Sequence, residues 1–178
     1  MLIKSGGEDR MIILGLDLSL SSTGWNLITH ENTVLGYDKI CTKSSKHTEF
    51  ERIQIIANAV KEIIEINSVD VVVIEDQYFS KNPKTGLTLS KLMGAIIYVC
   101  MESEVKIELL TPTQARKILS GDGKLKKEQI ANFIRENYID LGEFSNKAGK
   151  GKNSDLYDSL VVSLAWNKQN NLNEKWNK

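Results

Sequence analysis

The sequence lacks a long apolar run, has few cysteines and carries no net charge, and each of these features argues against a class of protein. No stretch approaches the roughly 18 consecutive apolar residues of a membrane span, and the first residues do not have the order of a signal peptide. Only two cysteines, Cys41 and Cys100, occur in 178 residues, and they lie far apart, so we expect neither a disulfide framework nor a zinc site. We therefore expect a cytoplasmic protein that does not bind a membrane.

The charges balance at 23 basic and 23 acidic residues, whereas a clear basic excess is typical of a nucleic-acid-binding protein. This balance conceals an asymmetry, because acidic residues dominate up to residue 110 and basic residues dominate after it. Lysines concentrate in two stretches, "GDGKLKKEQ" (121–129) and "FSNKAGKGKNS" (144–154). Both stretches fit solvated surface loops, and both also fit a DNA-binding surface formed by Lys124, Lys126, Lys147, Lys150 and Lys152.

Composition and hydrophobic periodicity indicate one α/β domain. We place it at residues 11–168, after a flexible N-terminal extension (1–10) and before a C-terminal tail (169–178). Short apolar or alternating runs predict strands, and amphipathic spacing predicts helices. The expected strands are 11–17, 23–29, 33–40, 70–76 and 105–110, and the expected helices are 51–66, 88–103, 111–119, 126–138 and 154–168. Right-handed crossovers would then give a five-stranded mixed sheet, with three antiparallel strands followed by two parallel ones, flanked by helices.

Two expected strands end in an acidic residue. Asp17 closes the first strand in "LGLDLSLSSTGW", and Glu75 closes the fourth in "DVVVIED". Either residue alone fits a solvated strand end. In the expected sheet, however, the ends of these two strands can be neighbours, so the two carboxylates together indicate a site.

The last expected helix supplies two more acids, Asp155 and Asp158, in "NSDLYDSL". Their spacing of three residues places them on one face of the first turn, where carboxylates also favour the positive end of the helix dipole. Asp158 lies next to the apolar residues Leu160 and Val161, where an unpaired charge is costly and a bound cation would relieve it. Oxygen ligands without histidine or cysteine favour Mg²⁺ or Mn²⁺ over zinc.

Four segments together resemble the RuvC Holliday-junction resolvases, particularly their phage-borne branch, within the ribonuclease-H-like nuclease superfamily. These segments are "GLDLSLSSTGW", "VVVIEDQYFSKN", "GKLKKEQIANFI" and "SDLYDSL", and the resemblance covers residues 11–168. It implies that the four acids are catalytic and bind two Mg²⁺ ions per active site, for which Mn²⁺ can substitute. It also implies that Lys127 assists at the active site and that Arg116 is a further basic residue facing DNA.

The resemblance also implies how branched DNA is recognised. Tyr78 or Phe79, in the loop after Glu75, would stack on an unpaired base, and Lys81 and Lys84 would meet phosphates. Asp76, beside the glutamate, departs from the amide expected there.

Two symmetric cuts require two active sites, so the resemblance implies a homodimer. We expect its interface on the apolar helix "LTLSKLMGAIIYVCM" (87–101), although the same helix could instead be buried within one domain. Whether a helicase partner is needed stays open.

Three functions remain in competition. The favoured one is a metal-dependent endonuclease that cleaves branched DNA, including Holliday junctions and three-way or forked DNA. A second is a ribonuclease-H-like nuclease acting on RNA–DNA hybrids or flaps, since acidic residues fix the reaction but not the shape of the nucleic acid. A third is a junction-binding module without catalysis.

Overall fold

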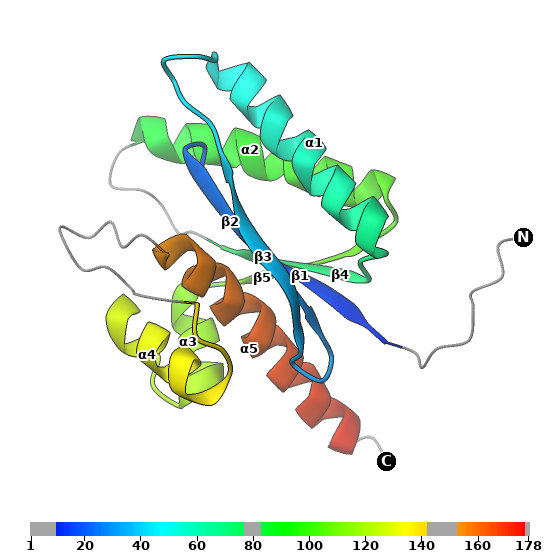
Figure 1. Ribbon diagram of the computed structural model, residues 1–178, viewed down its shortest axis with the longest axis vertical. Helices are drawn as coiled ribbons and strands as arrows, with labels where there is room; N and C mark the ends of the chain where they lie inside the picture. The colour runs from blue at the N-terminus through cyan, green and yellow to red at the C-terminus, as the bar shows by residue number, and fades with distance from the viewer. Residues whose placement is uncertain (1–9, 77–82, 142–152, 177–178) are drawn as a thin grey trace, which may run out of the picture.

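A five-stranded sheet with helices on both faces forms the structure, a computed structural model that describes residues 10–76, 83–141 and 153–176 (Figure 1). The strands lie in the order β3-β2-β1-β4-β5. β1 pairs antiparallel with β2 and parallel with β4, β2 pairs antiparallel with β3, and β4 pairs parallel with β5. Their bounds are Ile12–Asp17 for β1, Ser22–Thr29 for β2, Val34–Cys41 for β3, Val71–Glu75 for β4 and Lys106–Leu110 for β5. The predicted mixed sheet is confirmed.

The helices form two layers. Figure 1 shows α1 and α2 against one face of the sheet and α3, α4 and α5 against the other. Thr48 and Thr111 begin α1 and α3 with capping boxes, in which each threonine side chain accepts a hydrogen bond from the third helical backbone N–H. The bounds are Glu49–Asn67 for α1, Pro83–Glu102 for α2, Pro112–Ser120 for α3, Lys127–Asn137 for α4 and Ser154–Trp176 for α5. None of the helices in the described ranges is long and apolar enough to cross a membrane.

Two helices are longer than the periodicity predicts. α2 starts at Pro83 rather than near residue 88, and α5 continues to Trp176, through most of the expected tail. The extension of α5 has few apolar residues, and Asn171 within it contacts the β2–β3 turn together with Asn167 just before it. The side-chain amides of Asn167 and Asn171 both donate to the His30 carbonyl, at 2.9 and 3.1 Å.

Alternation along the strands divides the core in two and fixes the direction of the acids. In β1, Ile13 packs with the α3–α5 side, whereas Leu14 and Leu16 pack with the α1–α2 side. Because side chains alternate across a strand, Asp17 shares the α5 side with Ile13. The same count in β4 places Glu75 on that side with Val73.

α5 crosses β1 and β2 unusually closely because two glycines face it. A Cβ on Gly15 would overlap the main chain of α5 at Ser159, and a Cβ on Gly24 would overlap it at Asp155. Both strands therefore accept the helix backbone itself, which brings the first turn of α5 next to the ends of β1 and β4.

The two cysteines lie apart in the fold: Cys41 is exposed on β3 and Cys100 is buried on α2.

Candidate active site

Asp17 and Glu75 lie at the carboxyl ends of two neighbouring parallel strands. The last pair between the two strands is Leu16 with Ile74, and each acid follows directly after its member of that pair. Each retains only 6% of its solvent-accessible surface. This is the edge at which open α/β sheets bind ligands.

Burial and neighbouring negative charge keep these two carboxyls difficult to ionise. Burial, followed by the charges of Glu75 and Asp158, raises the pKa of Asp17 well above its usual value. Burial and the charge of Asp158 raise the pKa of Glu75 to about 7, although Lys127 and Arg116 act in the opposite direction. A group of buried acids with raised pKa values needs positive charge to ionise fully.

Asp158, in the second turn of α5, has an ion-pair partner from another helix. Its carboxylate accepts a hydrogen bond from the ammonium of Lys127, the first residue of α4, and its side chain is 5% exposed. Burial raises the pKa of Asp158, and Lys127 partly offsets the increase. Burial alone would lower the pKa of Lys127, but Asp158, Asp17 and Glu75 together raise it above its ordinary value. Lys127 therefore brings a permanent positive charge to the acids.

Arg116 adds a second positive charge from α3. Its guanidinium donates to the carbonyl of Leu125 at 3.1 Å, which holds it across the turn before α4. Its charge lowers the pKa of both Glu75 and Asp158, which places it within electrostatic reach of the site.

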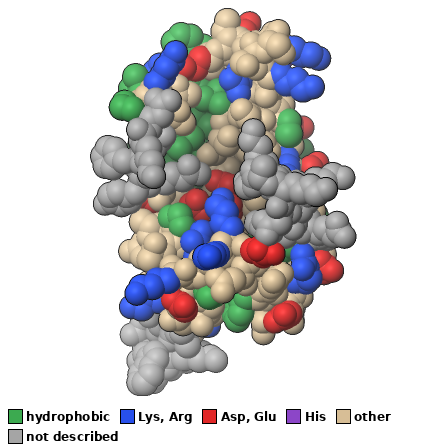
Figure 2. Space-filling view, turned by 90° about the vertical axis from the view of Figure 1, so that its left-hand side faces the viewer, with side chains coloured by type: hydrophobic (Ala, Val, Ile, Leu, Met, Phe, Trp, Pro, Cys, Tyr) green, Lys and Arg blue, Asp and Glu red, His purple; other side chains and the backbone are tan. Residues whose placement is uncertain are grey.

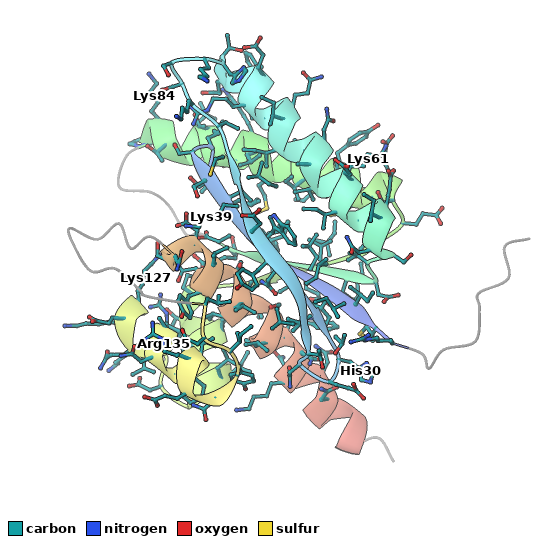
Figure 3. The ribbon with its side chains drawn as sticks, in the orientation of Figure 1. His30, Lys39, Lys61, Lys84, Lys127 and Arg135 are labelled. Carbon is teal, nitrogen blue, oxygen red and sulfur yellow. The ribbon has the colours of Figure 1, made fainter. Side chains whose placement is uncertain are left out.

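Asp155 is held from the sheet rather than from α4. Its Oδ2 accepts a hydrogen bond from Ser22 Oγ on β2 at 2.6 Å and lies 3.7 Å from Lys39 Nζ on β3. Figure 3 shows Lys39 and Lys127 near the same end of α5, reaching it from different elements. Sequence reasoning missed both contacts with Asp155. The pairing of Lys39 with Gly24, the glycine that faces Asp155, is the signal that identifies Lys39 once the register is known.

The chemistry of the four acids suits a divalent cation, but their conformations do not yet converge on one. Carboxylate oxygens without nitrogen or sulfur donors are the ligands of Mg²⁺ and similar hard ions. In the part of the chain that the structure describes, no three acidic, histidine or cysteine side chains are arranged to hold one ion. Asp158 and Asp155 instead each have a lysine ammonium beside one carboxylate oxygen, from Lys127 and Lys39 respectively.

The remaining predicted DNA-contacting residues fall into three groups. Lys124 and Lys126 are exposed on the turn that leads into α4, on the Lys127 side of the site. Lys84 is exposed in the first turn of α2, where its charge lowers the pKa of Glu49, and Figure 3 shows it well apart from Lys127. The others lie outside the described residues: Tyr78, Phe79, Lys81, Lys147, Lys150 and Lys152.

On the face of the molecule drawn in Figure 2, acidic side chains gather in the middle, with basic side chains directly beside them. A mixed sheet with acids at the ends of adjacent parallel strands, completed by acids from a helix laid across them, defines a ribonuclease-H-like nuclease. More particularly, the chain belongs to the RuvC family. The sequence model described as crossover junction endodeoxyribonuclease RuvC matches residues 13–162.

Individual relatives agree with this assignment. The crossover junction endodeoxyribonuclease RuvC of Caldicellulosiruptor saccharolyticus is 30% identical, over 86% of this chain and 90% of that protein. Thermus thermophilus RuvC, solved in complex with a Holliday junction substrate, superposes with a TM-score of 0.75 at 19% identity, covering 91% of this chain and 96% of that one. The fowlpox virus resolvase, solved with substrate Holliday junction DNA, gives 0.56 at 18% identity, covering 89% and 98%.

The resemblance inferred from the four sequence segments is therefore confirmed at the level of the family and its hydrolase class. Nucleases of this family depend on a divalent metal ion. The phage-borne branch and the individual roles of the site residues stay predictions.

Proposed function

We propose that this chain cleaves phosphodiester bonds in branched DNA, with Holliday junctions and three-way or forked DNA as substrates. The observation that carries the proposal is the meeting of Asp17, Glu75, Asp155 and Asp158 at one end of the sheet, with three of their pKa values raised. The relatives named for crossover junctions, and the two structures solved with junction DNA, support this choice of substrate.

Two Mg²⁺ ions, replaceable by Mn²⁺, would be held by the four carboxylates. Such a pair would activate the attacking water and neutralise charge on the phosphate and the leaving oxygen. Asp17 is within electrostatic reach of the other three acids, since the charges of Glu75, Asp158 and Asp155 each contribute to its raised pKa. We assign Asp17 to both ions, Glu75 to one side, and Asp155 with Asp158 to the other.

The basic residues near the acids serve the DNA strand. Lys127 lies at Asp158, and with a cation bound at that carboxylate its ammonium would be available to a DNA phosphate. Arg116, Lys124 and Lys126 extend the positive charge along α3, α4 and the turn between them, where it would follow a DNA backbone. We also propose the roles that the sequence suggests for two further sets of residues. Tyr78 or Phe79 would stack on an unpaired base, and the phosphate contacts would be Lys81, Lys84, Lys147, Lys150 and Lys152.

A homodimer through α2 completes the proposal, because two symmetric cuts need two sites. One side of α2 packs inside the domain, where Leu92, Ile96, Val99 and Cys100 are buried. Leu87, Tyr98 and Met101 remain 61%, 59% and 68% exposed. Their spacing places them along one side of the helix together with Gly94. A Cβ added at Gly94 would meet no atom within 4 Å, so this side of the helix is open. A second copy of the helix would cover this exposed side.

Two other functions remain as alternatives: cleavage of RNA–DNA hybrids or flaps, and junction binding without catalysis. Incubation with labelled four-way, three-way, hybrid and linear substrates in Mg²⁺ separates them. The proposal predicts paired cuts in the branched DNA and little product from the linear duplex. Preferential cleavage of the hybrid, or binding without product, would favour an alternative. A cytoplasmic location, with or without a helicase partner, stays a prediction.

A further inference from the structure

Lys39, on β3, lies beside Asp155, one of the four acids of the candidate active site. Its ammonium lies 3.7 Å from Asp155 Oδ2, and its side chain is only 19% exposed, which is low for a lysine. β3 is one of the two edge strands of the sheet, so Lys39 reaches Asp155 from the sheet, whereas Lys127 reaches Asp158 from α4. The two lysines thus approach α5 from two different layers of the fold (Figure 3).

The two lysines hold their acids differently. Lys127 makes a hydrogen-bonded ion pair with Asp158. The distance from Lys39 to Asp155 exceeds that of a hydrogen bond, and the short contact to the same oxygen comes from Ser22 Oγ at 2.6 Å. Ser22 and the Ser154 hydroxyl, 3.1 Å from Oδ1, therefore orient the carboxylate by hydrogen bonds, whereas Lys39 contributes charge from a longer distance.

A divalent cation and the Lys39 ammonium compete for Asp155. Two positive groups a few ångströms apart at one carboxylate repel each other, and the divalent ion carries twice the charge. The lysine side chain has four flexible methylene groups, so its ammonium can move while its backbone stays in the sheet. After leaving Asp155 the ammonium remains at the mouth of the site, where a DNA phosphate would approach the acids.

We propose that Lys39 is an exchangeable counter-charge: it pairs with Asp155 in the metal-free protein and with a DNA phosphate once a divalent cation occupies Asp155. The exchange makes cation binding and DNA binding mutually supportive, because the cation releases the lysine that the phosphate receives. The DNA half of this inference rests on the proposed function, whereas the competition at Asp155 rests on the geometry of the free protein.

The first experiment measures Mg²⁺ binding to the free protein by titration calorimetry. Lys39→Met keeps most of the apolar stem and removes the charge, so it should bind Mg²⁺ about threefold more tightly or better. Lys61→Met is the matched control. Lys61 also makes two long ion pairs, at 3.9 Å to Glu65 and 3.7 Å to Glu102, but it lies on α1 away from the site (Figure 3). Unchanged or weaker Mg²⁺ binding by Lys39→Met would overturn the competition.

The second experiment measures the salt dependence of binding to a four-way junction, with Ca²⁺ as the carboxylate-binding cation and again without divalent ions. With Ca²⁺, Lys39→Met should reduce the slope of log affinity against log salt by about 0.9, corresponding to one phosphate contact. Without divalent ions it should change the slope little. Lys39→Arg should keep the wild-type slope, and Ser22→Ala should also keep it, because serine carries no charge. Equal slopes for wild type and Lys39→Met in Ca²⁺ would overturn the DNA half.

Melting curves keep the two tests interpretable. If Lys39→Met does not fold, Lys39→Gln replaces it in both experiments with the same expected outcomes. If the wild type does not bind junctions at all, the proposed function fails, while the Mg²⁺ titration still decides the competition at Asp155.

Discussion

Gly24 lies directly against the main chain of Asp155, so closely that a Cβ at Gly24 would overlap the Asp155 carbonyl group. This contact fixes how far the first turn of α5 lies from β2. It therefore sets the position of an active-site acid through a residue that has no functional group.

Gly24→Ala should consequently disturb both stability and the site. The methyl group meets backbone rather than a flexible side chain, so α5 has to move, and we expect a loss of about 1–3 kcal/mol in the free energy of unfolding. Cleavage should fall by more than the stability loss explains, because Asp155 moves with the helix. Denaturant unfolding and single-turnover cleavage of a junction measure the two effects. Gly36→Ala on β3 is the control, since its Cβ would meet only the Trp25 ring at 3.8 Å. Equal behaviour of the two variants would contradict this view of the α5 contact.

The stability of the metal-free protein should fall as pH rises from about 4.5 to about 7. Burial raises the pKa of Glu75 from 4.5 to about 7, so within this range the folded protein binds more protons than the unfolded chain. Stability therefore decreases with pH, by a Glu75 contribution on the order of 3 kcal/mol across the range. Asp17 and Asp158 act with the same sign, because their pKa values are also raised.

Glu75→Gln should flatten this pH dependence, measured by chemical unfolding in a chelator at several pH values. Glu62→Gln, an exposed position on α1, should retain the wild-type profile. Adding Mg²⁺ at pH 7 should stabilise the wild type more than Glu75→Gln. If the free energy of unfolding instead rises through this pH range, burial does not raise the pKa values of Glu75 and Asp17 as described.

The proposed dimer can be separated from folding by one substitution on α2. Met101→Glu places a carboxylate on the exposed apolar side of the helix, which costs little in a monomer but much in an interface. Sedimentation velocity should show a dimer for wild type and a monomer for Met101→Glu, with similar melting temperatures. Ile66→Glu, at a residue 72% exposed on α1, should remain dimeric. A monomeric wild type at micromolar concentration would rule out the interface.

Much of the site could be predicted from the sequence because strand ends and helix turns are local features. Asp17 and Glu75 each close a recognisable apolar run, and a right-handed crossover makes those runs neighbours. The three-residue spacing of Asp155 and Asp158 likewise places them on one helix face.

The contact between Lys39 and Asp155 could not be predicted, because it depends on a register irregularity. Counted from the β2–β3 turn, where Ile28 pairs with Val34, Gly24 would lie opposite Asp38. The register shift between Leu27 and Ile28 instead places Gly24 opposite Lys39, and with it the lysine side chain on the α5 face. The length of α5 was missed for a related reason, since the hydrogen bonds from Asn167 and Asn171 to His30 are tertiary contacts that apolar periodicity does not reveal.

The four acids perform the cleavage in the proposed function, and the most direct measurement compares cutting with binding in one variant. Asp17→Asn keeps the size of the side chain but removes its charge. Asp17 is the acid on which the charges of the other three all act. Single-turnover cleavage of a four-way junction in Mg²⁺ should fall by at least about a thousandfold, a loss of roughly 4 kcal/mol of transition-state stabilisation. Junction binding in Ca²⁺ should stay within a few-fold of wild type, and the melting temperature of the metal-free protein should not fall. Cleavage by Asp17→Asn at the wild-type rate would contradict the account.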